Sequence, residues 1–157
     1  MKNEDHDKTS ALPAEEVLKL ENQLCFALYV SSKEIIRRYK PLLEPLHLTY
    51  TGYITMMALW EKDDISVKEL GKRLTLDSGT LTPLLKKLEL LSYIERIRSN
   101  DDDRSVRIRL TEAGRTLKAD AAAIPEKMIC SAGLEPEKLG PLLKSLHGFI
   151  GDLTAEP

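Results

Sequence analysis

Two short amphipathic segments followed directly by an alternating strand pattern constrain the fold most strongly. The sequence SVKE at residues 66–69 is a capping box, in which the serine accepts from early helix amides and the glutamate reaches back. It opens a short helix over VKELGKRL, and the connector TLDS leads into a second helical run over residues 79–91 with leucines on its inner side. Two such helices joined by a few residues indicate a helix-turn-helix.

A β-hairpin is predicted after the second helix. The stretch YIERIRS is separated from SVRIRLT by the polar residues NDDDR. In the second stretch Val106, Ile108 and Leu110 alternate with Arg107 and Arg109, the period of two that is typical of a half-buried strand. A hairpin directly after a helix-turn-helix predicts a winged helix, in which one helix enters the major groove and the hairpin tip reaches phosphates or the minor groove.

Further helices flank this unit. Apolar residues recur at three- and four-residue steps from Pro13 to about Glu44, which predicts one helix that Pro41 and Pro45 loosen or end. Residues 50–61 predict a second helix. Beyond the hairpin we expect one helix over residues 111–128 and another from residue 135 onward. The last helix has an almost heptad-like apolar stripe, formed by Leu139, Leu142, Leu143, Leu146, Phe149, Ile150 and Leu153.

The predicted fold class is mainly α with a small β-hairpin wing: a winged helix-turn-helix plus N- and C-terminal dimerisation helices. The apolar stripe of the last helix has to be buried, either against a partner subunit or against the first helix of the same chain. We expect residues 1–12 to be a disordered tail, residues 13–45 and 112–157 to form a helical dimerisation region, and residues 46–111 to form the DNA-binding domain.

Charge is distributed unevenly along the chain. The net charge is −2, yet residues 65–110 hold ten Lys/Arg against seven Asp/Glu. An acidic protein with a basic middle third can still bind phosphates through that third. The start MKNEDHDKTS lacks the features of a signal peptide, and no apolar run approaches the ~20 residues of a membrane span. We therefore expect a cytoplasmic protein without a membrane partner, in which thiols are reduced by default.

The segment LDSGTLTPLLKKLE is the most specific stretch. Asp77 or Ser78 can cap the helix, which leaves Ser78, Thr80 and Thr82 as hydroxyl donors at its positive end, suited to phosphates and base edges. Within a helix, Pro83 clashes with the carbonyl four residues back. Either the regular helix begins near Thr82 or its first turn is bent.

Four further residues are candidate DNA contacts. Lys86 and Lys87 lie one turn on, toward the DNA backbone, although a capped surface helix with solvated lysines is the plain alternative. In the hairpin tip, Asp102 can hold the Arg104 guanidinium pointing outward by charge-assisted pairing. A merely solvated acidic turn is the alternative there.

Cys25 begins a stripe on the first helix that continues through Tyr29 and ends at Tyr39. Tyr29 stands one turn from the sulfur and can donate a phenolic hydrogen bond to a thiolate, the form that attacks peroxides. Tyr39 is 14 positions away, about 21 Å along a straight helix. If both tyrosines serve the thiol, at least one belongs to another subunit. The plain alternative is a cysteine that packs as a small hydrophobe.

These motifs resemble the MarR family of dimeric winged-helix repressors. The likeness rests on LDSGTLTPLLKKLE and DDDRSVRIRLTEAG, and LCFALYVSSKEIIRRYK and LTYTGY narrow it to the organic-hydroperoxide-sensing branch. It covers about residues 20–128. The resemblance implies a homodimer on pseudo-palindromic double-stranded DNA, with the helix that carries Ser78 in the major groove and Arg104 in the minor groove, steadied by Asp102.

The resemblance also concerns the cysteines. In this branch the tyrosines that match Tyr29 and Tyr39 contact the cysteine across the dimer, and two-cysteine members close a disulfide between subunits. Cys130 is the candidate resolving thiol, although ICSAGLEP can equally be a mobile loop with an incidental thiol. Single-cysteine members pair with a small cellular thiol instead.

We therefore predict a redox-sensing transcriptional regulator, a repressor, that leaves its operator when organic hydroperoxide oxidises Cys25. One alternative is a ligand-gated repressor of the same family, in which a small aromatic acid wedges between domains. Another is a thiol peroxidase, against which the chain lacks both Thr-x-x-Cys and CxxC motifs. The histidines show no ligand spacing, so we expect neither a metal nor a cofactor.

Overall fold

The structure is a computed structural model, and it describes residues 13–98 and 106–155. The chain divides into two compact units, residues 1–37 and residues 38–157. The predicted tail over residues 1–12 lies outside the described residues. The hairpin tip that holds Asp102 and Arg104 lies outside them too.

The first unit contains α1 (Ala14–Val17), a 3-10 turn η1 (Leu20–Asn22) and the start of α2 (Leu24–Leu43). The prediction of one helix from Pro13 is therefore wrong. The Asn22 side-chain amide donates to the Glu16 carbonyl oxygen at 2.8 Å, and the Gln23 side-chain amide donates to the Val17 carbonyl oxygen. These side chains occupy carbonyls that helix amides would otherwise use, and such local competition ends the helix.

At the start of the second unit, α2 continues through Pro41 and ends at Leu43, and Pro45 lies in the following 3-10 turn η2 (Glu44–Leu46). Pro41 thus does not end the helix. The next helix, α3 (Tyr50–Glu61), has the predicted bounds and is capped by Thr49, whose side chain accepts from the Gly52 amide.

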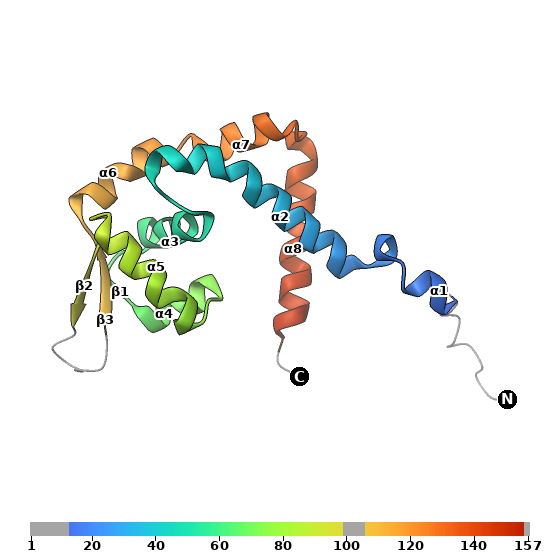
Figure 1. The fold of residues 1–157 in the computed structure, drawn as a ribbon, viewed down its shortest axis with the longest axis horizontal. Coiled ribbons are helices and arrows are strands. Elements are labelled where there is room, and N and C mark those ends of the chain that lie inside the picture. The colour runs from blue at the N-terminus through green and yellow to red at the C-terminus, as the bar shows by residue number, and fades with distance from the viewer. Residues whose placement is uncertain (1–12, 99–105, 156–157) are drawn as a thin grey trace. The chain divides into compact units, whose positions relative to one another are not determined.

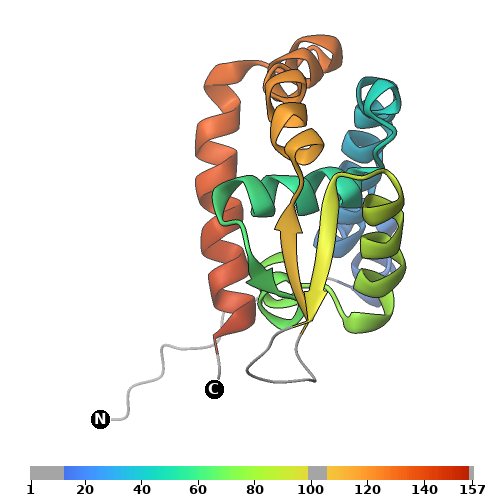
Figure 2. The same cartoon turned by 90° about the vertical axis from the view of Figure 1, so that its left-hand side faces the viewer.

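The winged helix is confirmed. It consists of α4 (Val67–Leu74), α5 (Ser78–Leu90) and the antiparallel strands β2 (Ile94–Arg98) and β3 (Val106–Leu110). A two-residue strand, β1 (Ile65–Ser66), was not predicted, because two residues carry no periodicity. It pairs with β3, so that β3 is the central strand of the sheet (Figure 2).

The core of this unit lies between the helices and the inner face of the sheet (Figure 1). Inward strand residues Ile94, Ile108 and Leu110 are buried there, as the alternation predicts. The helices contribute fully buried side chains to the same cluster: Leu43, Met56, Leu59, Leu70, Leu81, Leu85 and Leu88. Burial of these faces fixes α5 against the sheet and leaves its other face to solvent.

Two helices follow the sheet where one was predicted. They are α6 (Glu112–Ala121) and α7 (Ile124–Ala132). Pro125 lies in the first turn of α7 and has no amide hydrogen for a bond to a preceding turn, so the regular helix stops before it and restarts.

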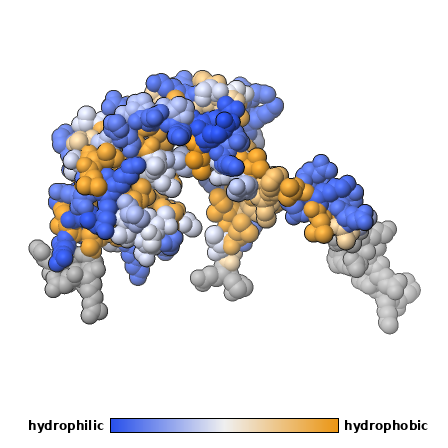
Figure 3. Space-filling model, viewed as in Figure 1, coloured by the Kyte–Doolittle hydropathy of each residue, from blue (hydrophilic) through white to orange (hydrophobic). Residues whose placement is uncertain are grey.

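The last helix, α8 (Pro136–Thr154), confirms the predicted terminal helix. None of its residues is buried, and Leu142, Leu143, Ile150 and Leu153 are exposed. Figure 3 shows apolar side chains over the part of the view where α8 lies. Among the described helices, none combines the length and apolar composition needed to cross a bilayer.

Candidate nucleic-acid interface and thiol site

Asp77 is the residue that caps α5. Its Oδ1 accepts from the Thr80 amide at 2.9 Å and its Oδ2 accepts from the Thr80 hydroxyl at 2.9 Å. These hydrogen bonds lower the pKa of the Asp77 carboxyl below its ordinary value, the Thr80 amide contributing most. A Cβ at Gly79 would stand only 2.9 Å from Oδ1, so glycine leaves room for the capping carboxylate.

The two faces of α5 differ sharply. Leu81, Leu85 and Leu88 are buried in the core. All six candidate DNA-contacting residues of this helix are exposed: Ser78, Thr80, Thr82, Pro83, Lys86 and Lys87. The helix runs without a break from Ser78 to Leu90 with Pro83 inside it, so a helix beginning near Thr82 is wrong. The exposed face combines short hydroxyls, two cations and a helix N-terminus, which is suited to nucleic acid.

The hydroxyls of this face are not equivalent. The Thr80 hydroxyl donates to Asp77, and the Thr82 hydroxyl donates to the Ser78 carbonyl oxygen at 2.7 Å. In this arrangement each threonine hydroxyl presents an acceptor to solvent rather than the predicted donor. Within the described residues, only the Ser78 hydroxyl of the three makes no hydrogen bond, so it alone has a proton to donate to a phosphate.

Three arginines of the hairpin strands form ion pairs within the chain. Arg96 pairs with Glu89 at 2.7 Å, and Arg107 pairs with Asp64 at 2.8 Å. Arg109 also pairs with Asp64, at 3.1 Å. Sequence reasoning missed this role of Asp64, which is far from its partners along the chain.

Cys25 is exposed and occupies the first turn of α2, with a free thiol. Tyr29 is exposed too, and its ring stacks on Phe26 with 6.5 Å between centroids while the Lys33 ammonium lies 5.9 Å from its centre. Within the described part of the first unit, the Tyr29 phenol does not donate to the Cys25 sulfur.

Tyr39 belongs to an aromatic cluster of the second unit. Its ring centroid lies 5.0 Å from that of Tyr50 and 5.9 Å from that of Tyr53. Burial raises the pKa of the Tyr39 phenol, and the neighbouring Tyr50 and Tyr53 raise it further. Tyr39 therefore remains a protonated donor at neutral pH. The contact between Tyr39 and Tyr50, which lies within the LTYTGY motif, was not predicted from the sequence.

Cys130 lies in α7, which ends at Ala132, so the alternative of a loop over ICSAGLEP is wrong for Cys130 and applies only to residues 133–135. Its thiol is free and exposed. Arg38 donates to the carbonyl oxygen of the next residue, Ser131, at 3.3 Å. An exposed thiol on a defined helix is available to another molecule.

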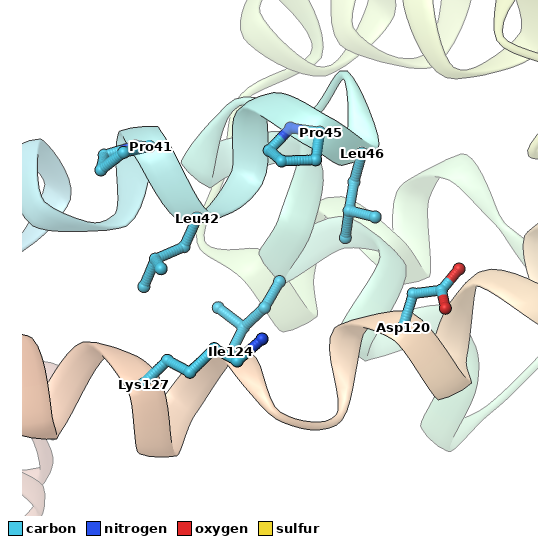
Figure 4. A pocket seen from close by; sticks show the side chains of 7 residues that line it. All are labelled: Pro41, Leu42, Pro45, Leu46, Asp120, Ile124 and Lys127. Atoms are coloured by element: carbon cyan, nitrogen blue, oxygen red, sulfur yellow. The ribbon is translucent and has the colours of Figure 1, made fainter.

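A small cleft of about 210 Å³ lies in the second unit. Figure 4 shows its lining, which is mostly apolar: Pro41, Leu42, Pro45, Leu46, Asp120, Ile124 and Lys127. Lys127 supplies a cation and Asp120 an anion. Within residues 13–98 and 106–155, the cleft included, no cluster of three or more His, Cys, Asp or Glu could hold a metal ion.

Three comparisons relate this architecture to known proteins. The family model for the transcriptional regulators SarA/Rot matches residues 37–121. The organic hydroperoxide resistance transcriptional regulator of Bacillus subtilis is 46% identical over 87% of this chain and 92% of its own length. The regulator SarZ of Staphylococcus aureus is 44% identical over 83% of this chain and 88% of its own length.

A solved structure agrees with the sequence comparisons. Reduced AbfR bound to DNA is 31% identical, with a TM-score of 0.71 over 88% of this chain and 96% of that one. The match includes the winged helix and extends beyond it. The chain belongs to the SarA/Rot family of transcriptional regulators, whose fold is the MarR-like winged helix.

Proposed function

We propose that this protein is a redox-sensing transcriptional regulator, a repressor, that binds pseudo-palindromic operator DNA as a homodimer. Organic hydroperoxide releases it by oxidising Cys25. The observation that carries the proposal is the presence on one chain of the exposed polar face of α5 and an exposed thiol in the first turn of α2. The hydroperoxide regulator and SarZ, both more than 40% identical, support it.

The DNA contacts divide by chemistry. Ser78 and the amides of the first turn of α5 face a phosphate or base edge, and Lys86 and Lys87 bind the backbone. Thr80, Thr82 and Pro83 form the surface that approaches the bases. Asp102 and Arg104, in the hairpin tip, are proposed to reach the minor groove.

The proposed redox step requires only the hydroperoxide and two thiols. The Cys25 thiolate attacks one peroxide oxygen, the O–O bond breaks, and the alcohol leaves after taking up a proton. The sulfenic acid then condenses with the Cys130 thiol of the other protomer, which forms a disulfide and releases water. Tyr29 and Tyr39 act as phenol donors to the thiolate, at least one from the partner protomer. The exposed apolar stripe of α8 is available for the dimer contact.

The test compares Cys25→Ser with Cys130→Ser in gel-shift titrations on an operator duplex, with and without cumene hydroperoxide. We expect Cys25→Ser to bind like the wild type and to stay bound in peroxide, whereas dithiothreitol restores binding of oxidised wild type. A non-reducing gel should show a dimer band in the wild type that disappears in Cys130→Ser. Release of Cys25→Ser by peroxide would overturn the sensing role.

A ligand-gated repressor remains a second candidate because of the cleft lined by Pro41, Pro45 and Ile124. Lys127 at this cleft can pair with the carboxylate of a small aromatic acid. Such a protein should respond to salicylate and ignore reductant, which separates the two mechanisms in the same gel-shift assay. The thiol peroxidase alternative is set aside because the family consists of regulators.

A further inference from the structure

The outer face of the wing carries a charge cluster centred on Asp64. In β3, Arg107 and Arg109 point away from the core, while Ile108 between them is fully buried. Asp64 precedes β1, which pairs with β3 in the order β1-β3-β2. One carboxylate therefore stands beside two arginines of the central strand.

Asp64 makes contacts with both arginines through its side chain and with one of them through its backbone. Oδ1 accepts from Arg107 Nε at 2.8 Å and Oδ2 accepts from an Arg109 guanidinium nitrogen at 3.1 Å. Arg107 also donates to the Asp64 carbonyl oxygen. The Asp64 backbone has φ of 53°, a left-handed conformation that is strained for most residues and tolerated by Asp. The Arg107 contact with the Asp64 carbonyl oxygen holds this turn beside β3.

The contacts of Asp64 with Arg107 and Arg109 form a clamp on β3, and Asp63 extends this Asp64 clamp to the end of the strand. Asp63 Oδ1 accepts from the Leu110 amide at 2.8 Å and from the Asp64 amide at 2.7 Å. Its Oδ2 pairs with Arg115 of α6 at 3.3 Å. The turn between α3 and β1 thus fixes β3 along its length and ties it to the helix that follows.

Fixing β3 matters because this strand and β2 carry the hairpin tip between them. Without Asp64, Arg107 would lose its ion pair and Arg109 would keep only the 3.9 Å contact with Glu95, so more unpaired positive charge would stand on the surface of a DNA-binding protein. Free cations bind phosphates without regard to sequence, whereas a fixed wing meets its groove with less loss of conformational entropy. Loss of Asp64 should therefore weaken specific binding, because the wing is less fixed, and should strengthen non-specific binding, because more cations are free.

We propose that Asp64 is a positioning residue for operator recognition: it holds Arg107 and Arg109 on the sheet and so orients the wing. This inference rests on the proposed DNA-binding function. It assigns the acid a role in selectivity in addition to the base contacts proposed for α5.

The experiment measures fluorescence anisotropy of two duplexes, one selected from a random pool by the wild type and one scrambled. We expect Asp64→Asn to lose about tenfold in affinity for the selected duplex because the wing is no longer pre-oriented. Affinity for the scrambled duplex should stay unchanged or rise. Glu95→Gln is the matched control, because Glu95 lies on the same face but its contact with Arg109 is long, at 3.9 Å. Its affinity should stay within about twofold of the wild type.

A double mutant shows whether the effect passes through the wing. Arg104→Ala should cost less affinity in the Asp64→Asn background than in the wild type, because a disoriented wing has less to lose. If Asp64→Asn fails to fold, Arg107→Lys keeps the charge, removes the Nε contact and should lower selectivity in the same direction. An unchanged ratio of selected to scrambled affinity in the folded variants overturns the inference. A wild type without any selectivity overturns the proposed function instead.

Discussion

The ring centroid of Tyr39 lies 5.0 Å from that of Tyr50, and both rings belong to the described part of the second unit. The two tyrosines come from different elements, α2 and the first turn of α3. Because burial raises the pKa of the Tyr39 phenol, this group keeps its proton at neutral pH and can donate to an anion. Packing against Tyr50 and Tyr53 therefore restrains the Tyr39 ring that carries this phenol donor.

Loss of the Tyr39 hydroxyl should slow sensing. A hydrogen bond to a charged group contributes about 1.5 kcal/mol, so Tyr39→Phe should slow oxidation of Cys25 by cumene hydroperoxide roughly tenfold. Stopped-flow trapping of the sulfenic acid measures the rate. Tyr53→Phe, which alters another ring of the same cluster, should oxidise at the wild-type rate. Equal rates in Tyr39→Phe and wild type would exclude Tyr39 from the thiol site.

The unequal hydroxyls of α5 lead to a second prediction. Ser78→Ala removes the one hydroxyl that is free to donate, so operator affinity should fall about fivefold to tenfold, the effect of one lost hydrogen bond. Thr82→Val keeps the shape and removes a hydroxyl whose proton is already used by the Ser78 carbonyl, so its effect should be smaller. Anisotropy titrations at fixed salt compare the two. A larger loss in Thr82→Val would mean that this hydroxyl rotates toward DNA.

Acid should reveal the Asp64 clamp. Hydrogen bonds from Arg107, then from Arg109, hold the pKa of Asp64 below its ordinary value of 3.8. A carboxyl with a lowered pKa in the folded protein stabilises it above the unfolded pKa, and this contribution is lost as pH falls through the folded pKa. The melting temperature of the wild type should therefore drop as pH falls below about 4.

Asp64→Asn should melt at a lower temperature at pH 6 and should lose less between pH 6 and pH 2.5. Some acid dependence remains in this variant, because Lys62 lowers the pKa of Glu69 and Thr80 lowers that of Asp77. Circular dichroism melts across this interval measure both curves. Parallel curves would show that the Asp64 ion pairs add no stability.

The contrast between what sequence predicted and what it missed has a physical cause. The capping by Ser66 and the alternation in β3 are local patterns, and both are confirmed. Helix breaks were missed because they depend on single side chains, such as the Asn22 amide that bonds the Glu16 carbonyl. Contacts made only by the fold were missed as well.

The Asp64–Arg107 pair is the clearest such contact, because its partners are 43 positions apart and no periodicity connects them. Among the site residues, exposure of the α5 face followed from the leucine spacing. The hydroxyl directions did not, since they depend on the cap that Asp77 provides. The roles of Cys25, Tyr29, Tyr39 and Cys130 remain predictions.

Gly114 lies in α6, beside the Tyr93 carbonyl in the link between α5 and β2. A Cβ there would stand 2.0 Å from the Tyr93 carbonyl oxygen, which already accepts from the Thr111 amide at 3.1 Å. The Gly114 carbonyl oxygen accepts from Trp60 Nε1 at 2.8 Å, so any shift of this backbone also disturbs the indole.

Gly114→Ala should therefore destabilise the protein by about 3 kcal/mol or more, since backbone rather than a flexible side chain has to move. Urea unfolding followed by fluorescence measures the loss, and the emission of Trp60, the only tryptophan in the sequence, should shift even in the folded state. Gly151→Ala in α8 is the control, because a Cβ there meets nothing within 4 Å. Alanine is the better helix former, so this variant should be neutral or more stable by up to about 1 kcal/mol. A Gly114→Ala variant as stable as the wild type would show that α6 docks on Tyr93 less closely than described.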